Sequence, residues 1–119
     1  MNESERLDLL SVAQDAATQA GELIRKEWRD PKRLPNKGFR DWVTKSDLAV
    51  QHLLTRVIGS QFPGHGFFTE EADETLSASG RVVWIIDPID GTSNYSRQQP
   101  NFCVSLAAVA EGRVQVGVI

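Results

Sequence analysis

Two aspartates that follow directly on an apolar run are the residues of this chain best suited to chemistry. The run is Val82-Val83-Trp84-Ile85-Ile86, and Asp87 and Asp90 come at its end. Two carboxylates converging at the end of a buried strand would cost on the order of several kcal/mol per unpaired charge. A divalent cation removes that cost, and carboxylate, carbonyl and water oxygens are the ligands that Mg²⁺ takes. The pattern indicates a Mg²⁺ site, the alternative being an aspartate-rich turn that caps the next segment.

The spacing of these two aspartates predicts a turn between them. Residues two apart share a face of an extended backbone, whereas Asp87 and Asp90 are three apart. Pro88 fixes its own φ and donates no N–H, and Gly91 allows backbone angles that are closed to other residues. We therefore expect the chain to fold back over residues 88–91. A glycine turn that leads into a helix also forms a site for anions.

Two further acidic segments strengthen the interpretation as a site. The short apolar run Phe67-Phe68-Thr69 ends in Glu70-Glu71, so a second strand is expected to end in carboxylates. Asp47 follows Thr44 and Ser46 and precedes a periodic apolar pattern, which predicts that it lies at a helix start. There it could simply cap the helix and complement its dipole, worth about 0.5–2 kcal/mol.

Taken in order, these segments resemble one known family. The chain contains K-x-x-x-D-x-V-T-x-x-D, then E-E, then W-I-I-D-P-I-D-G-T-x-N. This order resembles the inositol monophosphatase family of Mg²⁺-dependent, lithium-sensitive phosphatases, and the resemblance runs from about residue 21 to residue 119. A further motif of the family, W-D-x-A-A-G with a metal-ligating aspartate, does not occur. The chain therefore resembles the N-terminal portion of a longer domain.

The resemblance implies a role for each residue of these motifs. The metal ligands would be Glu70, Asp87, the backbone carbonyl of Ile89, and Asp90. Asp47 and Thr92 would orient and activate the attacking water as the catalytic pair. Substrate phosphate would be held at Asp90 and by the backbone N–H groups of Gly91, Thr92 and Ser93. Lys37 resembles the lysine of the family's active-site loop, with one residue fewer before Asp41 than in some members.

The implied reaction is Mg²⁺-dependent hydrolysis of a phosphate monoester by a metal-activated water, without a phosphoenzyme. Two metal ions about 3.5–4 Å apart would clamp the in-line displacement. The first substrate to consider is inositol monophosphate. The alternatives are 3′-phosphoadenosine 5′-phosphate, histidinol phosphate, fructose 1,6-bisphosphate, or a catalytically incomplete metal-binding fragment. A purely structural domain would leave the three acidic segments without a purpose.

Composition narrows the partners and the compartment. The chain has 119 residues, 40% of them hydrophobic, and a net charge of −3 without a basic run, which argues against nucleic acid and membrane surfaces as partners. The lone Cys103 fits a buried thiol in a reducing compartment. No secretory signal or bilayer-length apolar run is present, so we expect a cytoplasmic protein that acts on a small phosphorylated substrate. The resemblance implies a homodimer.

The predicted fold is of the α/β class, α+β layered, with helices packed on a mostly antiparallel sheet in one domain over residues 1–119. Apolar residues from Leu7 to Trp28 predict a helix over residues 4–29, followed by a loop over 30–40. A second helix is expected over 47–61 and strands over 66–69 and 81–87. Residues 101–110 and 113–119 are expected to form a hairpin around Glu111-Gly112. His52, His65 and the tryptophans are expected to be structural rather than ligands.

Overall fold

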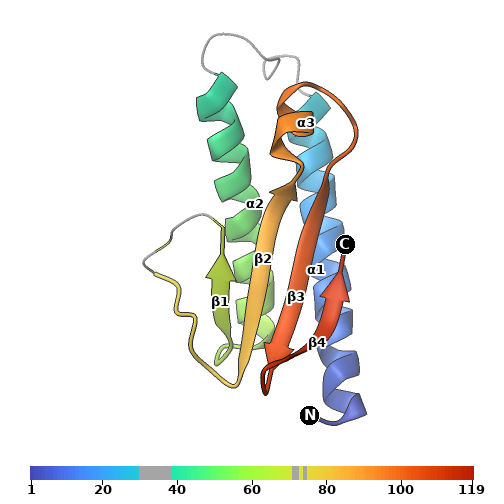
Figure 1. Cartoon of the computed structure of the whole chain (residues 1–119), viewed down its shortest axis with the longest axis vertical. Helices are drawn as coiled ribbons and strands as arrows, with labels where there is room; N and C mark the ends of the chain where they lie inside the picture. Colours follow the sequence, from blue (N-terminus) through green and yellow to red (C-terminus); the bar gives the residue numbers. More distant parts are fainter. Residues whose placement is uncertain (30–38, 71–72, 74) are drawn as a thin grey trace.

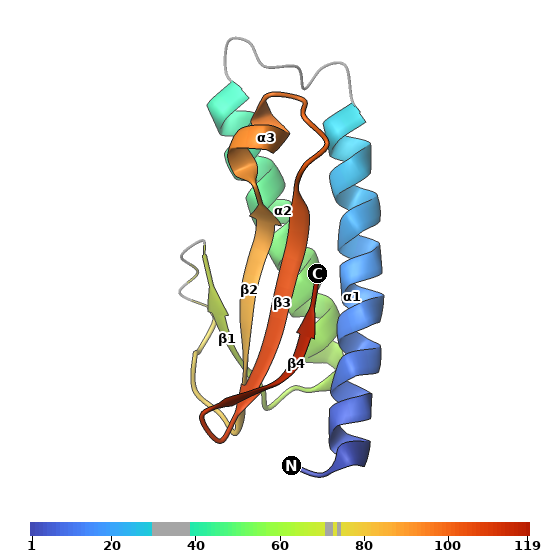
Figure 2. The same cartoon turned by 45° about the vertical axis from the view of Figure 1, so that its right-hand side comes forward.

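The molecule consists of two long helices and a short one around a four-stranded sheet (Figure 1). The computed structural model describes residues 1–29, 39–70, 73 and 75–119, without the side chains of residues 39–44. The helices are α1 (Glu3–Arg29), α2 (Phe39–Gln61) and α3 (Thr92–Ser96). The strands are β1 (Gly66–Thr69), β2 (Val82–Asp90), β3 (Cys103–Ala110) and β4 (Arg113–Val118). Figure 2 shows α2 passing behind β2 and α1 running beside β4.

The strands follow one another across the sheet in the order β1-β2-β3-β4. β1 pairs with β2 in parallel, and the other two pairs are antiparallel, which confirms the expected mostly antiparallel sheet. The predicted hairpin is also confirmed. Glu111 and Gly112 have φ of 56° and 72°, and two consecutive positive φ values are typical of the tight turns that match the twist of hairpin strands.

Both long helices pack on the same face of the sheet. Along β2 the side chains of Val82, Trp84 and Ile86 are buried on this covered face. The opposite, open face carries the alternate residues, among them the register partners Phe68 and Ile85, which are 62% and 46% exposed. The open face also includes Val83, Asp87, Ala107, Val109 and Val114. The core therefore lies between the sheet and the helices, and β2 has one buried and one exposed side.

Helix α1 begins with a capping box and packs against the core through a stripe that contains three alanines. Its first turn is fixed by a capping box, in which Asn2 Oδ1 accepts from the Glu5 N–H and a Glu5 carboxylate oxygen accepts from the Asn2 N–H. The predicted helix is confirmed, but the inclusion of Leu7 in its apolar stripe is wrong, because Leu7 is 57% exposed. The buried stripe consists of Leu9, Ala13, Ala16, Ala20 and Ile24.

Helix α2 begins eight residues earlier than predicted. Its first residue is Phe39 rather than Asp47, so the last two residues of the predicted loop, 39 and 40, are helical. Phe39 and Val43 are four residues apart and Val43 and Val50 are seven apart, so the apolar pattern of one helix face continues on both sides of the cap-like residues 44–47. Asp47 lies about two turns inside the helix, which rules out its capping role. Within the described residues, neither long helix holds an apolar stretch of membrane-spanning length.

Candidate active site

A bulge near the end of β2 brings Asp87 and Asp90 to the open face. Asp87 pairs with Ser105 and Asp90 with Cys103, so three steps along β2 match two steps along β3. Cys103 and Ser105 are two apart and share a face, and cross-strand partners point the same way. The expected turn over residues 88–91 is therefore wrong in form, because β2 continues to Asp90 and the chain turns only at Gly91.

Glu70 reaches the same place from the end of β1. Its backbone N–H donates to the carbonyl of Ile86 at 3.3 Å, which extends the parallel pairing of β1 and β2 by one residue. Ile86 directly precedes Asp87. Parallel strands end at the same edge of a sheet, so the acid that follows β1 lies beside the acids at the end of β2. The pairing of these two strands thus positions Glu70 next to Asp87.

Crowding among these acids perturbs Asp87. The pKa of Asp87 is raised to about 6, first by burial. The hydrogen bond to Glu70, the charge of Glu70 and the charge of Asp90 raise it further. Asp87 Oδ1 is buried without a hydrogen-bond partner in the described part of the chain. A buried carboxylate oxygen with no donor, beside two further carboxylates, fits a hard divalent cation. Within the same part of the chain, no three His, Cys, Asp or Glu side chains form a ready-made metal cage.

Gly91 turns the chain from β2 into α3. It has φ 93° and ψ 36°, and a Cβ at this position would lie 2.9 Å from the carbonyl oxygen of Asn101, so only glycine fits. Thr92 and Ser93 then begin α3. The Thr92 hydroxyl donates to the carbonyl oxygen of Ile89 at 3.0 Å. The four residues predicted to hold metal or phosphate through backbone groups, Ile89, Gly91, Thr92 and Ser93, therefore lie together in one turn.

Asp47 lies on α2, the helix that contacts α3. Its side chain is buried. The preceding residue, Ser46, accepts a hydrogen bond from the buried Tyr95 hydroxyl at 3.4 Å, and this ties α2 to α3. Figure 1 shows α3 beside the N-terminal half of α2. The predicted catalytic pair of Asp47 and Thr92 therefore comes from two elements that are bonded together, whereas Lys37 lies outside the described residues.

Comparison with known proteins identifies the family. A model described as the inositol monophosphatase family matches residues 5–119. The chain belongs to this family. The resemblance of its three motifs is thereby confirmed, and so is the layered fold of helices on a mostly antiparallel sheet.

Family relatives carry two kinds of name. The chain is 37% identical over 113 residues to a protein of Escherichia coli (strain K12) named Nus factor SuhB. This match covers 93% of the chain and 42% of that protein. It is also 37% identical over 115 residues to inositol monophosphatase 1 of Solanum lycopersicum, covering 94% of the chain and 42% of the relative. The chain thus spans about two-fifths of these relatives.

Solved structures agree with this assignment. The inositol monophosphatase of Anabaena (Nostoc) sp. PCC 7120 superimposes with a TM-score of 0.78 and 32% identity, over 95% of this chain and 39% of that one. The extragenic suppressor protein SuhB of Bartonella henselae superimposes with a TM-score of 0.80 and 26% identity. The match covers 94% of this chain and 43% of that one. The chain therefore has the fold of one portion of these longer family members.

The structure adds two residues to the site that the motifs did not single out. Cys103 and Ser105 lie on β3, where they pair with Asp90 and Asp87 of β2. Cys103 is half-buried rather than buried as predicted. Burial, followed by the charges of Asp90 and Asp87, raises the pKa of its thiol, which disfavours the reactive thiolate. No local signal in the sequence indicates either residue, because the register of β3 against β2 sets their partners, and the hairpin turn at Glu111-Gly112 fixes only β3 against β4.

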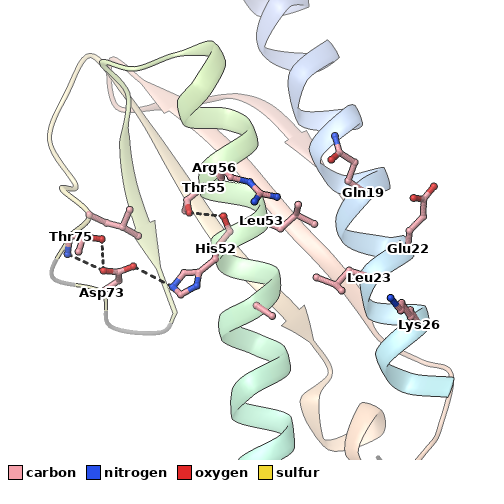
Figure 3. Close-up of a pocket in the computed structure, with 12 residues that line it drawn as sticks. Gln19, Glu22, Leu23, Lys26, His52, Leu53, Thr55, Arg56, Asp73 and Thr75 are labelled. Atoms are coloured by element: carbon pink, nitrogen blue, oxygen red, sulfur yellow. Dashed lines mark hydrogen bonds and ion pairs between the residues drawn. The ribbon is translucent and has the colours of Figure 1, made fainter. Parts of the chain in front are cut away.

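A wide groove of this family member lies elsewhere and contains none of the predicted site residues. It measures about 810 Å³ and runs between α1, α2 and the segment after β1 (Figure 3). His52 Nε2 lies 3.8 Å from Asp73 Oδ2, and the His52 side chain is 65% exposed, which confirms a surface histidine. Hydrogen bonds from Thr75 lower the pKa of Asp73. Glu22, Lys26 and Arg56 add charges of both signs, so the groove selects no single ligand charge.

Proposed function

We propose that this chain forms the acidic half of the active site of a Mg²⁺-dependent phosphatase that hydrolyses a phosphate monoester. The observation that carries this proposal is the crowding at Asp87, whose pKa is raised to about 6 and whose Oδ1 lacks a partner in the described part of the chain. A carboxylate left in this state costs stability in the absence of a cation. Perturbed acids that converge at strand ends are typical of sites that do chemistry.

Four groups of the chain would hold Mg²⁺ in this proposal. They are the carboxylates of Glu70, Asp87 and Asp90 and the backbone carbonyl of Ile89. Bound Mg²⁺ supplies Lewis-acid polarisation of the phosphate and lowers the pKa of a water molecule. The Ile89 carbonyl is suited to this role because the bulge takes it out of the regular hydrogen-bond ladder. It accepts a hydrogen bond from the Thr92 hydroxyl and keeps a second lone pair for a metal ion.

Thr92 and Asp47 would position the attacking water. The proton of the Thr92 hydroxyl points to Ile89, so its oxygen presents lone pairs that accept a hydrogen bond from water. Asp47 is a buried carboxylate on the helix bonded to α3, and it would accept the proton as general base. The family resemblance alone assigns Lys37 to the site.

The phosphate would be held by the backbone N–H groups of Gly91, Thr92 and Ser93 at the start of α3. The first N–H groups of a helix have no acceptor within the helix and therefore bind anions. Inositol monophosphate is the first substrate to test, because one relative is named inositol monophosphatase 1. The panel also includes 3′-phosphoadenosine 5′-phosphate, histidinol phosphate and fructose 1,6-bisphosphate. We further propose a cytoplasmic homodimer.

The test measures two quantities on the same protein: Mg²⁺ binding by calorimetry and phosphate release from the panel, with and without lithium. We expect Asp90→Asn to weaken Mg²⁺ binding and to reduce turnover by at least about a hundredfold, since it removes a proposed ligand. Asp15→Asn removes the same charge from the exposed surface of α1 and serves as the control.

Each result has a distinct meaning. Mg²⁺-dependent, lithium-inhibited turnover that is lost in Asp90→Asn supports the phosphatase. Mg²⁺ binding without turnover supports a metal-binding portion that needs the other three-fifths of the family fold for catalysis. Asp90→Asn with the same Mg²⁺ affinity and turnover as Asp15→Asn overturns the assignment of the site.

A further inference from the structure

Gly21 is a glycine in the C-terminal third of α1 that neither the backbone nor the packing requires. It lies inside a regular helix, and a Cβ built on it would meet no atom within 4 Å. Glycine is among the least favourable residues in a helix interior. Its presence here leaves open space on the side of α1 that faces the beginning of β3.

That space is a cavity of about 310 Å³ between the C-terminal third of α1 and the segment that leads into β3. This volume lies at the lower end of the range for small-molecule sites. The wall is largely apolar and is formed by Gly21, Ile24, Trp28, Pro100, Phe102, Cys103 and Val104. The Trp28 and Phe102 rings pack against each other at 5.7 Å between centroids. None of the predicted active-site residues lines this cavity.

The polar groups of the cavity are all donors. Trp28 Nε1 is buried and has no acceptor in the described part of the chain, which is costly for an indole N–H. The exposed guanidinium groups of Arg25 and Arg29 stand at the rim. No ion pair is found for either arginine among residues 1–29, 39–70, 73 and 75–119. The lining contains no acidic side chain among the described residues, and the carboxylates of Asp90 and Asp87 act on it only through Cys103.

We propose that this cavity binds a small aromatic carboxylate, with the ring against Trp28 and Phe102 and the carboxylate at the donors. An apolar wall with a few convergent polar groups is the usual form of a small-molecule site. A planar carboxylate matches the fork of an arginine guanidinium, and it also supplies the acceptor that the indole N–H lacks. The two sites have Cys103 in common, which lines the cavity and faces Asp90. The proposal does not depend on the phosphatase proposal, because no proposed metal ligand, catalytic residue or phosphate-binding residue lines the cavity.

Phenylacetate is the probe for the first experiment. The ¹H–¹⁵N spectrum of the chain contains one indole signal for each of Trp28, Trp42 and Trp84, and Trp28→Phe assigns the relevant one. We expect phenylacetate to shift the Trp28 signal saturably, while Trp84, which is fully buried elsewhere, stays in place. The neutral analogue phenylacetamide should bind at least about tenfold more weakly, because it lacks the negative charge that pairs with the guanidinium groups.

Two variants test the site itself. Gly21→Leu fills the open space and should abolish the shift, with Gly21→Ala as the smaller change at the same position. Arg25→Gln combined with Arg29→Gln should weaken phenylacetate about tenfold and leave phenylacetamide unchanged, whereas Arg56→Gln, in the groove of Figure 3, should change neither. Absence of a saturable shift, equal affinity for the acid and the amide, or full binding by a Gly21→Leu protein with an unchanged Trp84 signal overturns the proposal.

Discussion

The two faces of β2 have opposite properties. The covered face holds Trp84 and Ile86, which are almost fully buried against the helices, while the open face holds Ile85, which is 46% exposed, and the crowded Asp87. Residues one position apart therefore contribute either to folding or to the candidate chemistry, and seldom to both. The comparison shows that burial of Asp87 on the open face is too weak to prevent its ionisation. Together with the neighbouring acids it is strong enough to raise the pKa of this carboxyl.

The sharpest test of this comparison uses two neighbouring isoleucines. Ile86→Ala removes a side chain from the covered face and should lower the free energy of unfolding by about 2–5 kcal/mol. Ile85→Ala removes the same atoms from the open face and should cost about 1 kcal/mol or less. Urea unfolding of both variants measures the difference. Equal losses would mean that the open face is also covered in solution.

A second test concerns the turn that carries the phosphate-binding groups. Gly91→Ala should destabilise the protein by about 1–3 kcal/mol, because it combines a positive φ with a contact of 2.9 Å to the Asn101 carbonyl. Gly112→Ala is the matched control, with φ 72° and nothing within 4 Å of the new Cβ. Thermal unfolding of the two variants should show the larger loss at Gly91. A smaller loss at Gly91 than at Gly112 would contradict the close approach.

On the covered face, acid should weaken the fold through His65. Trp84 Nε1 donates to His65 Nδ1 at 3.0 Å, which requires a neutral imidazole, and burial followed by the charge of Arg81 lowers the pKa of His65 below its usual 6.5. The unfolded chain then binds a proton first, so this contribution is complete above about pH 6.5 and is lost as pH falls. We expect a loss of about 1 kcal/mol, measured by urea unfolding. His65→Gln should remove this acid-dependent step.

On the open face, the pH dependence should have the opposite sign. The pKa of Asp87 is about 6 in the fold against 3.8 ordinarily, so its contribution is complete below about pH 3.8 and is lost as pH rises through 6. Asp87→Asn should therefore stabilise the metal-free protein above pH 6, by less than about 1 kcal/mol after solvent screening. Thermal unfolding in a chelator measures this effect. A destabilised Asp87→Asn protein at pH 8 would contradict the crowding of the three acids.

The sequence predicted the elements of this fold better than their ends. Periodicity and turn residues correctly placed α1, both outer strands and the hairpin, because these signals are local. The start of α2 was misplaced, since the cap-like residues 44–47 lie inside a longer apolar pattern. The parallel pairing of β1 with β2, which sets Glu70 beside Asp87, depends on contacts between distant segments and has no local signal.

The candidate site divides in the same way. The motif around Asp87 and Asp90 indicated which groups could bind a cation. The geometry that brings them to one face is a bulge, and its position depends on the register of β3 rather than on residues 82–90 alone. Cys103 and Ser105 were missed for the same reason, and the tie between Tyr95 and Ser46 depends on the packing of α3 against α2.

The bulge in β2 also has a genetic consequence. An in-frame deletion of codon 88 would leave the two aspartates two positions apart, and on a regular strand that spacing again places both on the open face. What the shorter strand would lose is the bulge, which takes the Ile89 carbonyl out of the ladder so that it accepts from the Thr92 hydroxyl. The codon for Pro88 therefore sets the direction of a backbone oxygen on the next residue.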